Sequence, residues 1–173
     1  KTPGMGKSFI CIDDKELRKI IPKIYNKNFL TYGFSKKANF QILNARYKSN
    51  FSIFDLKTFT SGSGKKSIKK IKINLIGKHN VLNAVAAISL CLHLGIKLNV
   101  IKNSLKKFTG IERRLTKVFQ IKGREFYDDY AHHPTEIKSV LGSIRNTSKN
   151  RKIISVFQPH RYSRLKLLKK DFS

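Results

Sequence analysis

The chain is poor in cysteine, and this shortage argues against a disulfide-stabilised fold. Only Cys11 and Cys91 occur among 173 residues, and they lie far apart in the sequence. Two isolated cysteines without a repeated spacing are typical of buried structural thiols in a reducing compartment. We therefore expect a cytoplasmic protein.

Long apolar runs are also missing. No stretch approaches the roughly 20 apolar residues of a membrane-spanning helix, and no charged-then-apolar signal peptide opens the chain. Hydrophobic residues still make up 40% of the sequence, enough for a packed core, and the mean hydropathy of -0.36 suits a soluble protein with no membrane partner. Because the chain opens on Lys1 and ends inside a helical pattern, we expect it to be part of a longer reading frame.

Acidic residues are scarce, and the resulting charge would attract a polyanion. The sequence has 10 acidic residues against 37 lysines and arginines, a formal net charge of +27. Such a charge would draw any polyanion and give salt-sensitive binding, and nucleic acid is the obvious partner to consider. Its lysines, however, are spread over nearly every expected element, and no groove-reading module accompanies them. We expect no specific nucleic-acid binding, and a basic polyanion-binding module stays open as an alternative.

The most informative stretch is DDYAHHPTE, residues 128–136. The aromatic-bearing residues 124–127 before it predict a strand. After it, Pro134 suits the first position of a helix, a glutamate adds negative charge to the first turn, and apolar residues recur at helical spacing. His132 and His133 therefore lie in a strand-to-helix loop, where the free N–H groups of the helix favour an anion.

A second loop of the same kind follows. The run KIISVF, Lys152 to Phe157, predicts a buried strand, and the loop QPHRYSR, residues 158–164, leads toward another helix. This strand, helix and strand predict a right-handed crossover between parallel strands, with both loops at the carboxyl ends of the strands. Five basic side chains would then converge on one anion: His132, His133, His160, Arg161 and Arg164. A metal site at the histidine pair, as in a metal-dependent hydrolase, and plain solvated charge at the arginines stay open as alternatives.

Two other stretches suggest nucleotide binding. The opening GKS, residues 6–8, ends like a phosphate loop, but residues 9–12 predict a strand where that loop needs a helix, so we reject it. The stretch GKHNVLNAVAA, residues 77–87, places three polar side chains at a helix start: His79, Asn80 and Asn83. The second of them is expected to cap the helix. Together they suit the edge of a heterocycle, although a purely structural role stays open.

The rest of the pattern predicts an α/β chain. Further strands are expected at Asn28–Tyr32, Phe40–Arg46, Phe51–Leu56, Ile68–Leu75 and Lys117–Ile121, and helices at Glu16–Ile21 and Asn99–Phe108. Asp13 and Asp14 are candidate caps for the first of these helices. The segment SGSGKKS, residues 61–67, is expected to connect a hairpin, and residues 111–115 to form a hinge.

Four motifs, in order, resemble the Mur ligases of peptidoglycan synthesis: GKHNVLNAVAA, GIERR, DDYAHHPTEI and FQPHRYSR. The early segments CIDD and TYGFS fit the same family, so the resemblance spans nearly the whole chain. It implies that residues 1–111 are the latter part of a central ATP-binding domain. Residues 112–173 would be the start of a Rossmann-like C-terminal domain with parallel strands.

The resemblance also implies an activity. Enzymes of this family use ATP and Mg²⁺ to phosphorylate a muramate carboxylate, and an amine then attacks the acyl phosphate to form an amide. The QPHRYSR loop is similar to that of the branch that joins L-alanine to UDP-N-acetylmuramate. A ligase that recycles a murein tripeptide is the alternative.

Carried over onto matching positions, the resemblance implies which residues bind ATP. Adenine would be held by His79, Asn80 and Asn83. Arg114 would approach the phosphates, and Asp129 would reach the ribose. The phosphate loop and the magnesium ligands of the family have no counterpart here, so no residue of this chain is expected to bind metal.

The resemblance assigns the acceptor side of the reaction to the two basic loops. The alanine carboxylate and the nearby acyl phosphate would be bound by His133, Arg161 and Arg164. His132 would serve a phosphate or shape the turn. The expected catalytic residues are His133 and Arg114, and without the phosphate loop we expect no ligase activity from these 173 residues alone.

Overall fold

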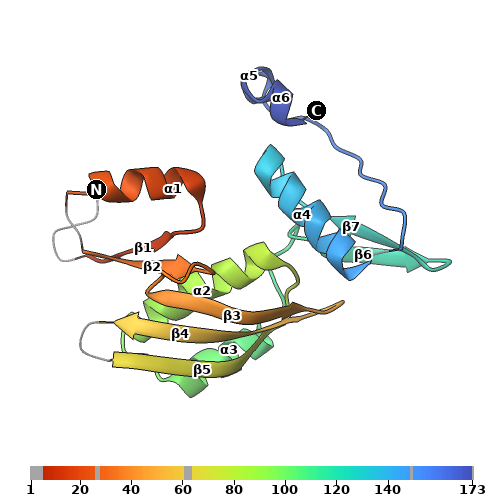
Figure 1. Ribbon diagram of the computed structural model, residues 1–173. Coiled ribbons are helices and arrows are strands. Elements are labelled where there is room, and N and C mark those ends of the chain that lie inside the picture. Colours follow the sequence, from red (N-terminus) through yellow and green to blue (C-terminus); the bar gives the residue numbers. More distant parts are fainter. Residues whose placement is uncertain (1–5, 26–27, 61–63, 149, 173) are drawn as a thin grey trace. The chain divides into compact units, whose positions relative to one another are not determined.

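Two compact units make up the chain. The computed structural model describes residues 6–25, 28–60, 64–148 and 150–172 (Figure 1). Unit 1 runs from Lys1 to Phe108, and unit 2 from Thr109 to Ser173. In the described ranges, no helix is both long enough and apolar enough to cross a membrane.

Unit 1 is built on a mixed five-stranded sheet. Its strands lie side by side in chain order: β1 (Ser8–Cys11), β2 (Phe29–Gly33), β3 (Phe40–Tyr47), β4 (Ser52–Thr60) and β5 (Gly64–Ile73). The first three run parallel, whereas β4 and β5 add antiparallel. The parallel strands β1 to β3 and the helices packed against the sheet confirm the predicted α/β class. Residues 61–63 of the predicted hairpin connection lie outside the described residues. The prediction of a loop is wrong for residues 64–67, which belong to β5 and pair with β4.

Helices cover one face of this sheet (Figure 1). They are α2 (Lys78–His93) and α3 (Leu98–Lys107). In the sequence, α1 (Lys15–Ile20) and the 3-10 turn η1 (Ile21–Lys23) connect β1 to β2. The core fills the space between sheet and helices, because inward strand residues recur with period two and the helix residues that meet them recur with period 3.6. Its buried members include Ile42, Phe54, Leu56, Ile71, Val81, Val85 and Ile88.

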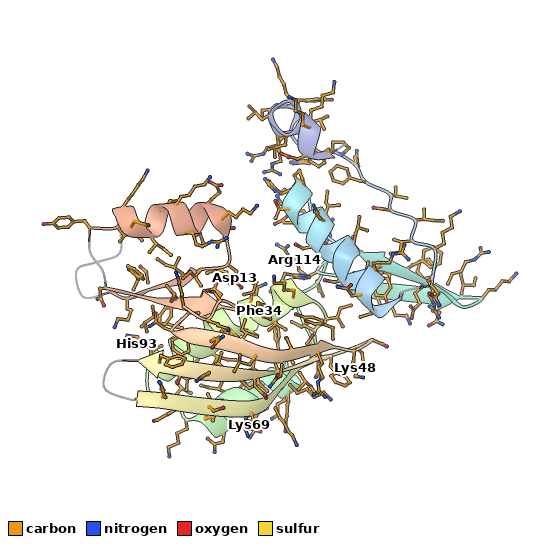
Figure 2. All side chains as sticks on the ribbon, viewed as in Figure 1. Asp13, Phe34, Lys48, Lys69, His93 and Arg114 are labelled. Carbon is orange, nitrogen blue, oxygen red and sulfur yellow. The ribbon has the colours of Figure 1, made fainter. Side chains whose placement is uncertain are left out.

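Asp13 links the end of β1 to the loop after β2. Of the two candidate caps of α1, only Asp14 acts as one, accepting from Leu17 N at 2.8 Å. The prediction is wrong for Asp13, whose Oδ2 accepts from Phe34 N at 2.7 Å and whose Oδ1 accepts from Ser35 N at 3.1 Å (Figure 2). The Asp13 carboxylate accepts from two backbone donors in the loop after β2 and therefore does not cap its own helix. Asp13 thereby holds the carboxyl ends of two parallel strands together.

Gly33, the last residue of β2, packs against that carboxylate. A Cβ atom at this position would lie 2.7 Å from Asp13 Oδ1, and the φ angle of Gly33 is 152°. Both the space and the backbone conformation therefore favour glycine here.

Asp55 joins two irregularities in neighbouring strands. The pairing register shifts in β3 beside Asn44, which has a φ of 51°, and in β5 beside Lys70, which has a φ of 55°. Asp55 lies between them on β4, and its Oδ2 accepts from Asn44 Nδ2 at 2.8 Å while its Oδ1 accepts from Lys70 N at 2.9 Å. The hydrogen bond from Asn44 and then that from Lys70 hold the pKa of the Asp55 carboxyl below its ordinary value.

The Asp55→Asn variant is expected to lower the free energy of unfolding by about 1 kcal/mol at pH 7, because a carboxamide can accept only one of the two donors. The carboxylate contributes fully above the unfolded pKa of about 3.9, and its contribution is lost as the pH falls through the lower folded pKa. Urea unfolding of both proteins from pH 7 to pH 2 measures the difference. A gap that stays constant below pH 4 would contradict this role.

Unit 2 begins with a β-hairpin. β6 (Thr116–Ile121) and β7 (Arg124–Asp128) pair antiparallel, and both residues of the connecting turn, Lys122 and Gly123, have positive φ angles, as tight hairpin turns require. α4 (Pro134–Thr147) follows a short loop, as predicted. The last helices are α5 (Tyr162–Leu167) and α6 (Lys169–Phe172).

The strand predicted at Lys152–Phe157 is not formed. Residues 152–161 have no regular secondary structure, and Val156 is 96% exposed. A continuous apolar run becomes a strand only where neighbours pair with its backbone and cover both of its faces. Within the described part of unit 2, the only sheet is the β6–β7 hairpin, so the predicted crossover between parallel strands is wrong for these residues.

Candidate functional site

The loop between β7 and α4 presents two histidines in different roles. His133 is the N-cap of α4, and its Nδ1 accepts from Thr135 N at 3.3 Å. Because Nδ1 accepts, the neutral ring carries its proton on Nε2 and can donate it to an anion. Pro134 occupies the first helical position, as predicted from the sequence.

His132 is turned back onto its own loop. Its Nδ1 lies 2.9 Å from Tyr130 O, and since a carbonyl oxygen can only accept, Nδ1 carries a proton. The Tyr130 ring packs edge-on against the imidazole at 5.1 Å. The backbone N–H of His132 donates to Glu136 Oε2 at 3.1 Å, so His132 shapes the entry to α4.

Glu136 is the acidic centre of this loop. Desolvation acts to raise the pKa of its carboxyl, but the His132 N–H and ring, the His133 N–H and the charge of Arg114 outweigh it, so that the pKa is lowered. Arg114 Nη1 lies 4.0 Å from Glu136 Oε1, at the outer limit of an ion pair between half-exposed side chains. The sequence pattern predicts only a negative charge in the first helical turn at this position. Its spacing of four residues from His132 was a usable signal for the contact.

Arg114 and Asp129 are brought together in unit 2. Asp129 Oδ2 accepts from Leu115 N at 2.7 Å, and its Oδ1 accepts from Ala131 N at 2.7 Å. Arg114 lies directly before Leu115, so the residues predicted for phosphate and for ribose share one small region (Figure 2 labels Arg114).

The QPHRYSR loop forms its own cluster. His160 and Arg161 line an open hollow of about 530 Å³ together with Tyr162 and Leu165. Arg161 has a φ of 68°, a left-handed conformation that is uncommon outside glycine and concentrates at functional sites. Among the described residues, Arg164 Nη1 is buried and has no hydrogen-bond partner.

The three polar residues predicted for adenine lie at the start of α2 in unit 1. The prediction that Asn80 caps the helix is wrong: α2 begins at Lys78, and Gly77, with a φ of 96°, occupies the cap position. Asn80 lies one turn in, where its Nδ2 donates to Ile76 O at 2.8 Å. Asn83 is exposed and three residues further, so the two amides share a helix face, as do His79 and Asn83.

Metal-ligating side chains do not gather into a cluster in the described part of the chain. In the part of the chain that the structure describes, no group of three or more histidine, cysteine, aspartate or glutamate side chains could hold a metal ion. β1 begins at Ser8 directly after Gly6 and Lys7, which agrees with rejecting a phosphate loop there.

Comparison with known protein families covers most of the chain. Residues 2–91 match the Mur ligase middle domain, and residues 113–172 match the Mur ligase glutamate ligase domain. The chain belongs to the Mur ligase family. This finding confirms the resemblance seen in the four motifs.

This Mur ligase chain is similar to two bacterial ligases along nearly its whole length. It is 49% identical over 173 residues to the UDP-N-acetylmuramate--L-alanine ligase of Pelagibacter ubique (strain HTCC1062), and 45% identical over 172 residues to that of Brachyspira hyodysenteriae. The alignments cover 100% and 99% of this chain, but only 37% and 36% of the relatives. The chain therefore spans about a third of the length of these Mur ligases.

Solved structures of Mur ligases have the same fold. The UDP-N-acetylmuramate-alanine ligase of Thermotoga maritima matches with a TM-score of 0.66 and 30% identity, over 81% of this chain and 32% of that one. A murein peptide ligase from Psychrobacter arcticus matches with a TM-score of 0.64 over 92% of this chain and 32% of that one. At 21% identity, the second likeness concerns the fold alone.

Proposed function

We propose that this chain is part of an ATP-dependent amide ligase that adds L-alanine to UDP-N-acetylmuramate in the cytoplasm during peptidoglycan synthesis. The observation that carries the proposal is the match along the whole chain to alanine-adding Mur ligases, at up to 49% identity. Residues 1–111 would belong to the central ATP-binding domain, and residues 112–173 to the C-terminal ligase domain.

In the proposed reaction, the muramate carboxylate takes the γ-phosphoryl group of ATP, and ADP leaves. The amine of L-alanine attacks the acyl carbon, the amide bond forms, and phosphate departs with the acyl oxygen. Mg²⁺ would neutralise charge on the phosphates, and the family resemblance places its ligands outside this chain.

Each unit, taken by itself, contains candidate nucleotide-binding residues. His79, Asn80 and Asn83 have the donors and acceptors to pair with the adenine edge. Asp129 would accept from the ribose hydroxyls, since each carboxylate oxygen can accept two hydrogen bonds and the contacts to Leu115 and Ala131 use one on each. The guanidinium of Arg114 would face the phosphates.

The carboxylate of L-alanine would be bound by donors of unit 2. His133 is suited to this task because its cap leaves a ring N–H to donate. The buried Nη1 of Arg164 supports the assignment, since a buried guanidinium nitrogen without a partner is costly unless an anion meets it. Arg161, held in a strained conformation, would complete the group with His132 at its edge.

The experiment that tests this function uses the full-length protein, with the reading frame extended upstream to its start codon. It is called the extended protein below. ADP release is measured with ATP, Mg²⁺ and UDP-N-acetylmuramate, and with L-alanine, the murein tripeptide or neither. We expect release that depends on L-alanine, and none from the 173 residues alone. Release that requires the tripeptide would assign the recycling reaction instead. Ligase activity of the 173-residue chain would contradict the proposal that these residues alone are inactive.

A further inference from the structure

The turn that carries Arg114 has an uncommon backbone. Arg113 has a φ of 58° and Leu115 a φ of 51°, so the residues on both sides of Arg114 are left-handed. Residues other than glycine rarely adopt this conformation, and it persists only where surrounding contacts hold it.

The contacts that hold this turn come from the loop after β7. The carbonyl of Arg113 accepts from Tyr130 N at 2.7 Å, and the N–H of Leu115 donates to Asp129 Oδ2 at 2.7 Å. The two backbone groups that flank Arg114 are therefore tied to two consecutive residues. Asp129 is itself fixed, because its second oxygen accepts from Ala131 N.

The neighbouring side chain is held as well. Arg113 Nε donates to Asp128 Oδ2 at 3.2 Å, and the Arg113 guanidinium lies 5.0 Å from the centre of the Tyr130 ring. With Arg113 turned to the end of β7, it is Arg114 whose guanidinium approaches Glu136.

We propose that Asp129 is a positioning residue that sets the place of Arg114 by holding the left-handed turn at Leu115. This role is separate from its contact with ribose. The hydrogen bond from Leu115 N–H to Asp129, called the tether below, is a property of the described chain. Its effect on catalysis rests on the proposed function.

The tether is tested first in the 173-residue chain by amide hydrogen exchange. Asp129→Asn keeps the size of the side chain but replaces the charged acceptor of Leu115 N–H by a weaker neutral one that can also turn to Ala131, so the Leu115 amide is expected to exchange about tenfold faster or more. Glu125→Gln is the matched control, because Glu125 also accepts two hydrogen bonds in unit 2, from Lys117 and Arg151, and lies outside the turn. Unchanged exchange at Leu115 in Asp129→Asn would overturn the tether.

The effect on catalysis is tested by a double-mutant cycle in the extended protein. If Asp129 acts through Arg114, Asp129→Asn lowers kcat, and adding it to Arg114→Ala changes kcat by less than about twofold. If Asp129 serves ribose alone, Asp129→Asn raises KM for ATP and leaves kcat unchanged in both the wild-type and the Arg114→Ala protein, and the proposal fails.

The Leu115→Gly substitution supplies an independent check of the proposal. Since glycine adopts positive φ without strain, Leu115→Gly is expected to restore part of the kcat lost in Asp129→Asn. Lack of any rescue would contradict the proposal. If the extended protein releases no ADP under any condition, the proposed function fails while the exchange experiment still decides the tether. Normal ADP release with unchanged Leu115 exchange rejects the tether alone.

Discussion

Replacing Arg114 with alanine in the extended protein is expected to lower kcat about 10²- to 10³-fold. A guanidinium aimed at charge that develops on a transferring phosphoryl group stabilises the transition state more than the ground state. Its loss costs little stability, because the side chain is 53% exposed and its ion pair with Glu136 is long. The measurement is the initial rate of ADP release at saturating ATP, UDP-N-acetylmuramate and L-alanine.

Two matched variants make this result specific. Arg114→Lys keeps the charge but loses the planar fork, so its loss of kcat should lie between wild type and alanine. Arg151→Ala removes another exposed arginine of unit 2, paired with Glu125 at 3.1 Å, and should change kcat by less than about twofold. A rise in KM for ATP with an unchanged kcat in Arg114→Ala would contradict a role in the chemical step.

Gly33→Ala is expected to have the largest effect on stability, about 3 kcal/mol in the free energy of unfolding of unit 1. The new methyl group would push the Asp13 carboxylate away from Phe34 N and Ser35 N, and both hydrogen bonds would be lost. Alanine must also adopt a φ of 152°. Urea unfolding followed by circular dichroism and by hydrogen exchange in β1 and β2 measures the loss.

Substitutions at two other glycines separate the cost of backbone strain from the cost of the steric contact with Asp13. Gly95 follows the end of α2 with a φ of 77° and open space around it, so Gly95→Ala should cost only the backbone strain, about 1 kcal/mol. Gly142 lies inside α4 with open space, so Gly142→Ala should stabilise unit 2 by up to about 1 kcal/mol. Equal losses in Gly33→Ala and Gly95→Ala would reject the steric role of Asp13.

The loop that carries the two histidines could be predicted because its determinants are local. Aromatic residues before Asp128 favour a strand, and Pro134 followed by helical spacing favours a helix, so the loop between them is fixed within a few residues. The same holds for the strands of unit 1, whose alternation survives in the buried positions of β5. The functional roles of all the site residues stay predictions: His79, Asn80, Asn83, Arg114, Asp129, His132, His133, Arg161 and Arg164.

Contacts between segments distant in the sequence could not be predicted in this way. Asp13 was expected to serve its own helix, yet it binds backbone donors that follow β2. Nothing local to Asp129 indicates Leu115 as its partner. Residues 152–157 have the composition of a buried strand, but composition does not supply the neighbours that such a strand needs.

Residues 153–157, IISVF, form a short aggregation-prone segment. Ile154 and Val156 are mostly exposed, and the segment contains no charged residue and no proline. Segments of this kind pair with copies of themselves. The net charge of +27 keeps molecules apart, but dissolved salt limits that repulsion to about 8 Å at 0.15 M. We therefore expect the chain to stay dispersed in dilute buffer and to associate through these segments in concentrated salt.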